Sequence, residues 1–330
     1  MAKINTKKTL ICLKSGAVLP IPPANFLEVE EEILLTPEVT TEEFKRINGK
    51  LGANASYADT CHTTVSQTIS TKMRFQNSAA DALDTVPEYG ELLKIGGFDE
   101  TIDTSTLGEE TVTYTNTQAP VLGSAVVYLD GNKHTMTNSI AADLTFNFPI
   151  GSPATVSAAL SAFIDNKGIS TSEANPTVTL LDEAVLLVGC ADIMTAGGVN
   201  ISPDNITIAM GADIQEFYGM GELKQFNMTD YMIKVTADFY PENANYNDAI
   251  TKLGAETIEA LSIKLGTLEG ALVNGKSVQI DCDFGQVSTF SDSSDKSTLK
   301  RSVTWLLTGE NQISIKHGFH ALHVGKTLRS

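Results

Sequence analysis

The amino-acid sequence predicts a mainly β fold, a β-rich α+β chain built as an antiparallel β-barrel or sandwich with a few short inserted helices. The chain of 330 residues contains 37 Thr, and β-branched residues favour the pleated surface of a strand. From residue 111 onward, apolar and polar residues alternate in short runs, which is the period of a half-buried strand. The few helical segments stand between groups of strands, so a doubly wound α/β fold is not expected.

Residues 1–80 are expected to form an N-terminal arm or extension rather than a compact domain. A proline-rich entry at 20–23 precedes an acidic run at 28–32. One short helix is predicted in this arm, because Thr40 and Glu43 have the spacing of a capping box and Gly49 would end the helix.

Residues 81–330 are expected to form the β domain, and three helices are predicted in it. The first begins near Pro87 and ends at Gly96-Gly97. A second is predicted near 153–167, where the apolar residues lie on one helical face. The third is predicted near 247–253, followed by the helix-terminating Gly254. The apolar positions of the second helix are Val156, Leu160, Phe163 and Ile164.

The strands of this domain follow from alternation and turn signals. The turn sequence Asp130-Gly131-Asn132 joins two alternating runs and predicts a hairpin. About ten strands are predicted in all. They lie at 111–115, 125–129, 143–148, 177–181, 184–188, 205–210, 232–239, 260–265, 277–284, 302–307 and 312–316.

Composition limits the environment of the chain. Apolar residues make up 42%, enough for a sizeable core. The longest apolar run, 184–191, is too short to cross a bilayer, and Lys14 ends the apolar stretch 10–13 too early for a signal peptide. No membrane insertion is expected. The four cysteines, at 12, 61, 190 and 282, are far apart and are interpreted as reduced thiols.

Charge argues against a nucleic-acid-binding protein. The chain has 40 acidic and 23 basic residues, a net charge of −17, whereas affinity for phosphates comes from Lys and Arg. Residues 1–14 contain four Lys and no acid, and 296–330 form a basic C-terminal tail. These ends are either solvated tails or the parts of one copy that meet the acidic body of the next copy.

No motif indicates catalysis, so no catalytic, cofactor-binding or metal-binding residue is predicted and the protein is not expected to be an enzyme. A phosphate-binding loop is absent from the sequence. The triplet His317, His320 and His323 would need a helix to hold zinc, and its surroundings favour a strand. Cys61-His62 are adjacent and would face opposite ways. Four aspartates fit no calcium-loop spacing and are interpreted as solvated. They are Asp281, Asp283, Asp292 and Asp295.

Several segments, taken in order, resemble the major tail, or tail-tube, proteins of long-tailed bacteriophages. The segment 87–98, PEYGELLKIGGF, is similar to the family's short "P…GELLKACGF" helix. The strand VTYT at 112–115 is similar to the family's "YTP" strand, and AVVYLDGN at 125–132 is similar to its strand ending in "DG". The chain departs from the pattern at Ile95-Gly96 and Asn116, and an Ala-Arg element is missing. Further similar segments are 140–148, 265–280 and 305–309.

The resemblance implies a structural subunit that self-assembles into rings, usually hexameric, which stack into a hollow tube. DNA would pass through an acidic lumen without specific binding. The implied partners are other copies of the chain, together with tape measure, tail terminator and baseplate or tail-tip proteins, and a sheath if the tail is contractile. The implied location is the virion tail, with the host cytoplasm during assembly.

Two alternatives remain open from the sequence. The chain is also compatible with the tube subunit of a phage-derived contractile injection system, which no residue distinguishes from a virion tail. A β-sandwich adhesin or glycan-binding surface domain belongs to a different functional class. The single Trp and 7% aromatic content offer few platforms for stacking sugar rings, which disfavours the second alternative.

Overall fold

The computed structural model gives the fold of most of the chain, and expectations for other residues lie outside its description. It describes residues 9–21, 25–35, 38, 41–45, 54–58, 63–73, 86–103, 111–117, 120–164, 170–177, 185–189, 193–218, 224–242, 248–268, 271–272, 277–309 and 312–318.

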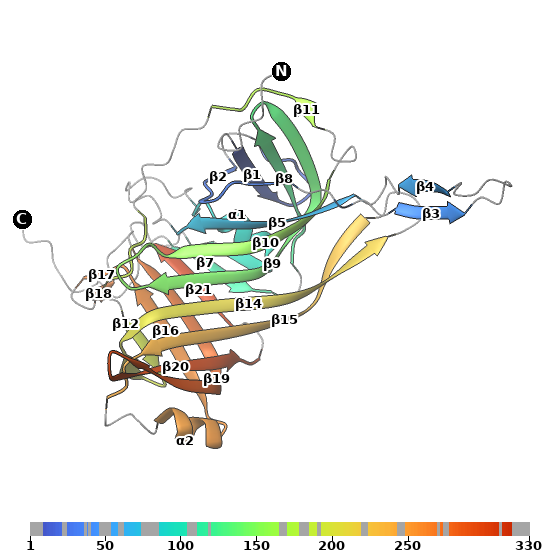
Figure 1. The fold of residues 1–330 in the computed structure, drawn as a ribbon. Coiled ribbons are helices and arrows are strands. Elements are labelled where there is room, and N and C mark those ends of the chain that lie inside the picture. The colour runs from blue at the N-terminus through green and yellow to red at the C-terminus, as the bar shows by residue number, and fades with distance from the viewer. Residues whose placement is uncertain are drawn as a thin grey trace, which may run out of the picture.

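The described part is mainly β, as the sequence predicts. One antiparallel sheet contains 17 strands, and two small two-stranded sheets accompany it. The two helices in the described ranges are short: α1 covers Gly90–Ile95 and α2 covers Asp248–Gly254 (Figure 1). The large sheet is branched and does not close on itself. No helix of the described residues is long and apolar enough to span a membrane.

The first part of the chain builds a six-stranded arrangement that we call the first unit (residues 9–164). Its strands pair in the order β2-β1-β8-β9-β10-β5. Helix α1 follows β5 in sequence and precedes β8. The strands are β1 (Thr9–Ser15), β2 (Phe26–Leu27), β5 (Thr64–Lys72), β8 (Gly123–Leu129), β9 (Asn132–Pro149) and β10 (Thr155–Ile164).

The later part repeats the same arrangement, and we call it the second unit (residues 193–307). Its strands pair in the order β13-β12-β16-β19-β20-β15. Helix α2 follows β15 and precedes β16, and both units contain one strand of 18 residues followed by one of 10. The strands are β12 (Ile193–Ala196), β13 (Val199–Ile201), β15 (Lys224–Phe239), β16 (Ile258–Leu265), β19 (Val278–Asp295) and β20 (Thr298–Leu307).

The two units share a sheet through strand β14 (Pro203–Tyr218). On one side β14 forms a long hairpin with β15, and on the other it pairs with the end of β9, from Asn205 opposite Pro149 to Met210 opposite Leu144. One continuous layer results, with the order β5-β10-β9-β14-β15-β20-β19, which Figure 1 shows from the middle of the molecule downward. We call this layer the long sheet.

The remaining strands extend the large sheet at other places or stand apart from it. Strand β21 (Ser314–Gly318) joins β19 to β7 (Thr111–Asn116), and β7 pairs with β6 (Phe98–Asp103). Strands β3 (Thr41–Lys45) and β4 (Asn54–Ala58) form a separate hairpin. The short strands β11 (Thr171–Ser172), β17 (Thr267–Leu268) and β18 (Ala271–Leu272) are peripheral.

Two bulges allow β9 to serve both units. Asn138 and Asp143 have φ values of 49° and 51°, and the register of β9 against β10 shifts at each of them. Asn and Asp tolerate this left-handed backbone better than most residues, and a bulge bends and twists its strand. The first part of β9 therefore pairs with β8 and its last part with β14.

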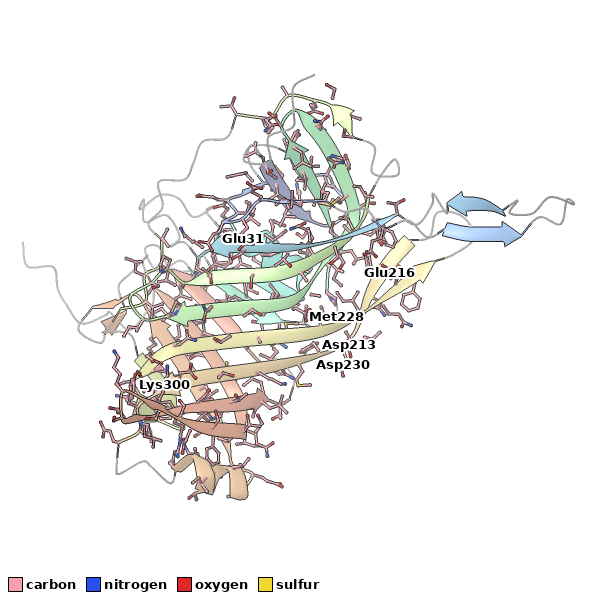
Figure 2. The ribbon with its side chains drawn as sticks, viewed as in Figure 1. Glu31, Asp213, Glu216, Met228, Asp230 and Lys300 are labelled. Carbon is pink, nitrogen blue, oxygen red and sulfur yellow. The ribbon has the colours of Figure 1, made fainter. Side chains whose placement is uncertain are left out.

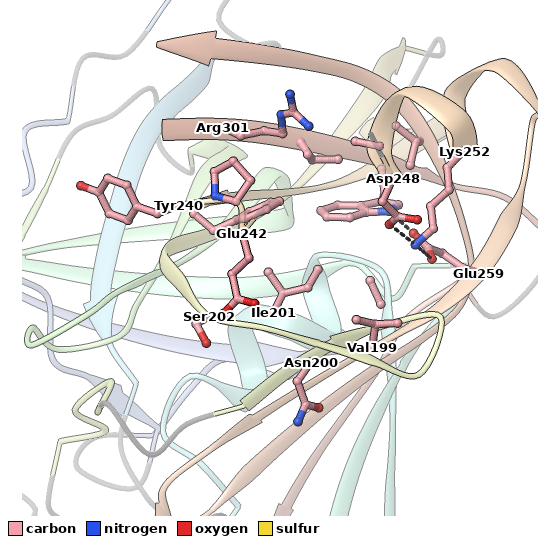
Figure 3. A pocket seen from close by; sticks show the side chains of 17 residues that line it. Val199, Asn200, Ile201, Ser202, Tyr240, Glu242, Asp248, Lys252, Glu259 and Arg301 are labelled. Carbon is pink, nitrogen blue, oxygen red and sulfur yellow. Dashed lines mark hydrogen bonds and ion pairs between the residues drawn. The ribbon is translucent and has the colours of Figure 1, made fainter. Parts of the chain in front are cut away.

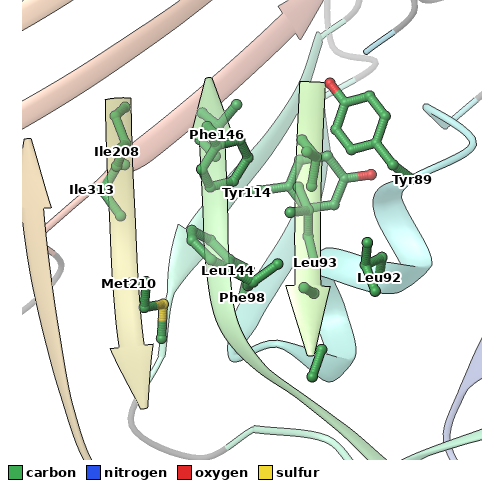
Figure 4. Packing of buried hydrophobic residues seen from close by; sticks show 14 of the residues in the cluster. Tyr89, Leu92, Leu93, Phe98, Tyr114, Leu144, Phe146, Ile208, Met210 and Ile313 are labelled. Carbon is green, nitrogen blue, oxygen red and sulfur yellow. The ribbon is translucent and has the colours of Figure 1, made fainter. Parts of the chain in front are cut away.

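The core lies between the layers, around α1. Leu92, Leu93 and Ile95 of this helix are fully buried. Figure 4 shows the helix beside Leu144 of β9 and Phe98. Helix α1 therefore holds the first unit together by filling the space between its sheets.

Two of the predicted helices are wrong. The segment predicted as a helix near 153–167 is strand β10, which is paired on both edges, with β5 and with β9. Its Val156, Ala158, Leu160 and Ala162 alternate on one buried strand face, so its apolar residues fit either period and the two neighbouring strands decide the outcome. The helix predicted from Thr40 contains β3, which pairs with β4. A local capping signal does not nucleate a helix against such pairing.

Most other predicted elements are confirmed. The helix after Pro87 is α1, the helix near 247–253 is α2, and Asp130-Gly131 turns the β8–β9 hairpin with positive φ at both residues. Most predicted strands lie in β7, β8, β9, β14, β15, β16, β19, β20 and β21. The segment 184–188 differs, since its described residues make isolated bridges only, one of them at Leu187. Most of 177–181 lies outside the described residues.

The first 80 residues contribute directly to the sheet. Strand β1 pairs along its whole length with β8, and Ile11 and Leu13 are buried in the core. Strand β5 forms an outer part of the long sheet. These parts of the expected arm are therefore integral to the first unit.

Replacing Gly123 with Ala should destabilise the fold. A Cβ at this position would collide with Ile95 of α1 and lie 2.8 Å from the carbonyl oxygen of Lys14. Because the backbone carbonyl cannot move aside cheaply, we expect the free energy of unfolding to fall by about 1–3 kcal/mol in chemical denaturation. Gly211→Ala is the matched control, since its Cβ would only reach Asp143 at 3.8 Å. Equal stability of the two variants would contradict the packing described for α1.

Candidate functional site

The long sheet has one buried face and one face toward solvent. On β10, Val156 and Leu160 are buried, whereas Thr155, Ser157 and Ser161 between them are half-buried. The same alternation continues on β9, β14, β15 and β20. Strand periodicity thus separates an apolar face, packed on the core, from a polar face.

Small polar side chains, most of them hydroxyls, fill most of one row across this polar face, and a second row mixes them with Ala209, Lys234 and Leu306. Thr207 lies beside Asn147 with 3.3 Å between their side-chain oxygens, and Thr236 shares a 3.0 Å hydrogen bond with Thr304. Such cross-strand pairs stabilise a sheet without bulky side chains. One row runs Lys72, Thr155, Asn147, Thr207, Thr236, Thr304, Thr289, and the next runs Ser70, Ser157, Thr145, Ala209, Lys234, Leu306, Gln286.

Charges on the polar face are few and of both signs. Asp213 and Asp230 stand opposite each other on the β14–β15 hairpin, and Figure 2 shows them at its bend. Lys234 lies farther along β15 and is exposed. No arginine occurs on this face among the described residues, since Arg301 is buried. The face therefore lacks the clustered cations that would hold a phosphate backbone.

The long sheet ends at both edges on backbone with open hydrogen-bonding positions. Beside β5, the segment 30–35 makes one backbone hydrogen bond to the strand, from the Glu30 amide to the Ser70 carbonyl. At the other end, residues 288–295 of β19 pair with β20 on one side. No further strand pairing of these two stretches occurs among the described residues. Open edges are a template for another strand.

Each unit contains a lysine that joins its helix to a strand. Lys94 contacts Glu91 at 2.7 Å and Glu100 at 3.3 Å, and the Tyr114 hydroxyl donates to Glu100 at 2.8 Å. The second unit repeats this cluster with different residues. Lys252 contacts Asp248 at 2.8 Å and Glu259 at 2.7 Å, and Trp305 Nε1 donates to Glu259 at 2.7 Å.

The surroundings of these two lysines stabilise their charged form. Burial lowers the pKa of Lys94 and of Lys252, but the hydrogen bonds and charges of the carboxylates raise it more, so each lies above its ordinary value of 10.5. A raised folded-state pKa stabilises the fold at all pH values below 10.5, and this contribution is lost as the pH rises through the folded-state pKa. The two clusters are therefore structural at neutral pH.

A hollow of about 130 Å³, open to solvent, lies beside α2 (Figure 3). Both of its basic groups have acidic partners: Lys252 contacts Asp248 and Glu259, and Arg301 contacts Asp292 at 2.7 Å. Its remaining lining includes Val199, Ala249, Val303 and Trp305. We find no nucleophile and base within hydrogen-bond reach of each other there, as covalent catalysis would need.

The histidines and cysteines singled out in the sequence form no site in the described ranges. His317 is buried, and its Nε2 lies 2.8 Å from the Tyr89 hydroxyl, while His320, His323, Cys61, His62 and Cys190 lie outside those ranges. Cys12 and Cys282 are buried free thiols. Burial raises the pKa of Cys12 to about 11 and also raises that of Cys282, so neither is a ready nucleophile.

The four aspartates have separate surroundings. Asp281 accepts a hydrogen bond from Ser262 at 2.6 Å, Asp292 binds Arg301, and Asp295 accepts from Tyr240 at 2.7 Å. Asp283 is exposed and lies on β19 with the other three. Within the described residues, no three His, Cys, Asp or Glu side chains lie together as a metal site requires.

Sequence reasoning missed the features that stand out in the fold. The hydroxyl rows were visible only as a high Thr content, because the register between strands is not encoded locally. The two lysine clusters had a weak signal in the similar segments LLKIG and ITKLG.

Comparison with known proteins does not identify a family for this chain. A scan against protein-family models finds no match. A search of curated proteins finds no match either.

Replacing Lys252 with Met should destabilise the second unit. The Glu259 side chain is only 4% exposed and would lose its cation. Breaking a buried pair in this way costs about 3–5 kcal/mol. Lys300→Met is the matched control, since Lys300 and Asp204 are 28% and 29% exposed, and an exposed pair contributes less than about 1 kcal/mol. Urea denaturation at pH 7, followed by the single Trp, would measure both, and equal effects would contradict the structural role of Lys252.

Proposed function

We propose that this chain is a structural subunit of a bacteriophage tail tube, which assembles into stacked rings around a channel for DNA. The observation that carries the proposal is the long sheet. It presents rows of small hydroxyl side chains on one face and ends at both edges on open strand positions. Strand pairing between copies would extend this sheet around a ring, with the polar face turned inward.

The polar face suits a channel wall. Ser and Thr side chains keep the wall hydrated and smooth, and the absence of arginine from its described part avoids strong contacts with phosphates. The net charge of −17 adds a general repulsion of DNA. An acidic lining of the lumen is part of the proposal, and Asp143, Asp213, Asp230 and Asp238 are its candidates among the described residues.

The resemblance of 87–98 and 125–132 to tail-tube proteins supports the same function. The first of these segments is α1 with its flanks, which fills the core of the first unit, and the second is the hairpin turn between β8 and β9. The proposed partners are therefore further copies of the chain, with tape measure, terminator and tail-tip or baseplate proteins at the ends of the tube. A sheath joins them if the tail contracts.

Self-assembly is the first test of this function. The purified full chain, concentrated at neutral pH, should form rings or tubes with a central channel, because both edges of the long sheet then find partners. Negative-stain microscopy and sedimentation velocity would detect them. A monodisperse monomer at every concentration would contradict the proposal and favour a monomeric surface-binding domain.

Adding a cation to the channel wall tests the role of the polar face. Thr207→Lys places an ammonium group in the centre of a hydroxyl row. We expect tubes to form, but DNA ejection from particles that carry the variant should slow, since lysine attracts the phosphate backbone. Thr207→Gln is the control for side-chain size. Identical ejection rates for the two variants would contradict the proposal that this face lines the channel.

A further inference from the structure

The two units differ in one respect that their shared topology does not explain. Helices α1 and α2 follow corresponding strands, β5 and β15, and Lys94 and Lys252 each contact one acid of their own helix and one acid of a later strand. Counting from these lysines, Leu92 corresponds to Ile250. Leu92 is 0% exposed, whereas Ile250 is 44% exposed.

The same contrast appears one turn later in the two helices. Ile95 is 0% exposed, and its counterpart Leu253 is 36% exposed. Two further apolar residues of the second unit, Ile258 and Phe284, are 57% and 45% exposed. The second unit thus leaves an apolar patch open at the place where the first unit is sealed, and an exposed patch of this kind marks an interaction site.

The β14–β15 hairpin of the second unit reaches the end of α1. Met210 and Met228 of this hairpin lie over Gly97 at the end of α1, within about 3.5 Å of where a Cβ would stand. Figure 4 shows Met210 beside Leu144 and Phe98. The pairing of β14 with the end of β9 holds the hairpin in this position.

The free ends of the long sheet are the counterparts of this internal junction. Ser70 on β5 and Asp238 on β15 occupy equivalent positions, because they pair with Ser157 of β10 and Ser302 of β20. Glu30 lies against Ser70 as Asn205 lies against Asp238. The segment 30–35 therefore corresponds to residues 205–210 of β14, and the equal lengths of β9 and β19 make 290–295 correspond to 144–149.

We propose that residues 290–295 of one copy pair antiparallel with residues 30–35 of the next copy, in the register of the internal β9–β14 junction. Asp295 then lies opposite Glu30, Ser293 opposite Glu32 and Phe290 opposite Leu35. Segment 30–35 and β5 of the neighbouring copy then take, beside α2, the place that β14 and β15 hold beside the end of α1. This inference rests on the proposed tube function and specifies the contact between its subunits.

Charges near the junction fit this pairing in part. The first-unit edge carries Glu30, Glu31 and Glu32, with Lys72 at 3.4 Å from Glu30. At the second-unit end, Lys296 follows Asp295 directly in the β19–β20 turn. The like charges of Asp295 and Glu30 would therefore face each other with a lysine beside each of them, which limits their repulsion.

The proposed contact joins two different surfaces, so it is heterologous and propagates from copy to copy until a ring closes. Each chain supplies two units. A closed ring therefore holds an even number of units, and a ring of six units needs three chains.

Disulfide trapping between two variants, each with one added cysteine, tests the register. Glu32→Cys and Ser293→Cys are prepared in a chain in which Cys61 and Cys190 are serine, since Cys12 and Cys282 are buried. Directly opposed residues of an antiparallel pair have Cβ atoms about 4.5–5.5 Å apart, close to disulfide range. Oxidation of mixed, assembled variants should give a covalent dimer on a non-reducing gel. The control replaces either of the two variants with Ser157→Cys, which lies in the middle of the polar face. This combination should give no covalent dimer.

A backbone variant tests the pairing independently. The Glu30 amide points toward β5, so the Glu31 amide points outward, where the next copy would accept its hydrogen bond. Glu31 is exposed and lies on the upper side of the long sheet in Figure 2. Glu31→Pro should raise the protein concentration needed for assembly at least tenfold and leave the thermal melting curve close to that of Glu31→Ala.

The outcomes separate this inference from the tube function. Tubes that form without the Glu32–Ser293 disulfide, or that form equally well with Glu31→Pro and Glu31→Ala, would overturn the proposed junction and leave the tube function in place. A chain that never assembles would overturn both. Trapping of the predicted pair, together with impaired assembly of Glu31→Pro, would support the junction.

Discussion

The fold depends on the backbone pairing between the end of β9 and β14. This junction turns two similar six-stranded arrangements into one long sheet, and it places the β14–β15 hairpin over Gly97 at the end of α1. Strand edges carry unpaired amide and carbonyl groups, which are satisfied by another strand or by water. Where the chain supplies that strand itself, the helix and the apolar residues around it are buried. At the two ends of the long sheet, among the described residues, the chain does not supply it.

The long strand β9 makes this arrangement possible because it changes partners along its length. The bulges at Asn138 and Asp143 bend it, so that one strand belongs first to the inner pairing with β8 and then to the junction with β14. Its counterpart β19 also shifts register against β20, between Val287 and Thr289. We interpret the exposed apolar residues of α2 as the consequence of a pairing that the single chain leaves incomplete. The need to pair strand edges therefore accounts both for the burial of the apolar residues of α1 and for the exposure of those of α2.

Local sequence was sufficient for elements whose pattern fits one structure only. The Asp130-Gly131 hairpin and helix α1 were predictable, because a turn with positive φ and a Gly-terminated amphipathic segment each have few alternatives. Strand β10 was not, since its Val156, Leu160, Phe163 and Ile164 fit a helical period while its alternating Val, Ala, Leu and Ala fit a strand, and its two neighbours come from residues 64–72 and 132–149. The hydroxyl rows and the repeated strand order depend on register between distant segments, which composition does not reveal.

The central claim is that neighbouring copies repeat the internal junction and so continue the polar face around a channel. A cryo-electron microscopy reconstruction of assembled particles tests this claim most directly, because it places every strand of one copy beside those of the next. The account predicts density for residues 30–35 running antiparallel along the outer edge of β19, with α2 covered and the hydroxyl rows lining the lumen. A β19 edge facing solvent, or a lumen lined by another surface of the chain, would contradict it.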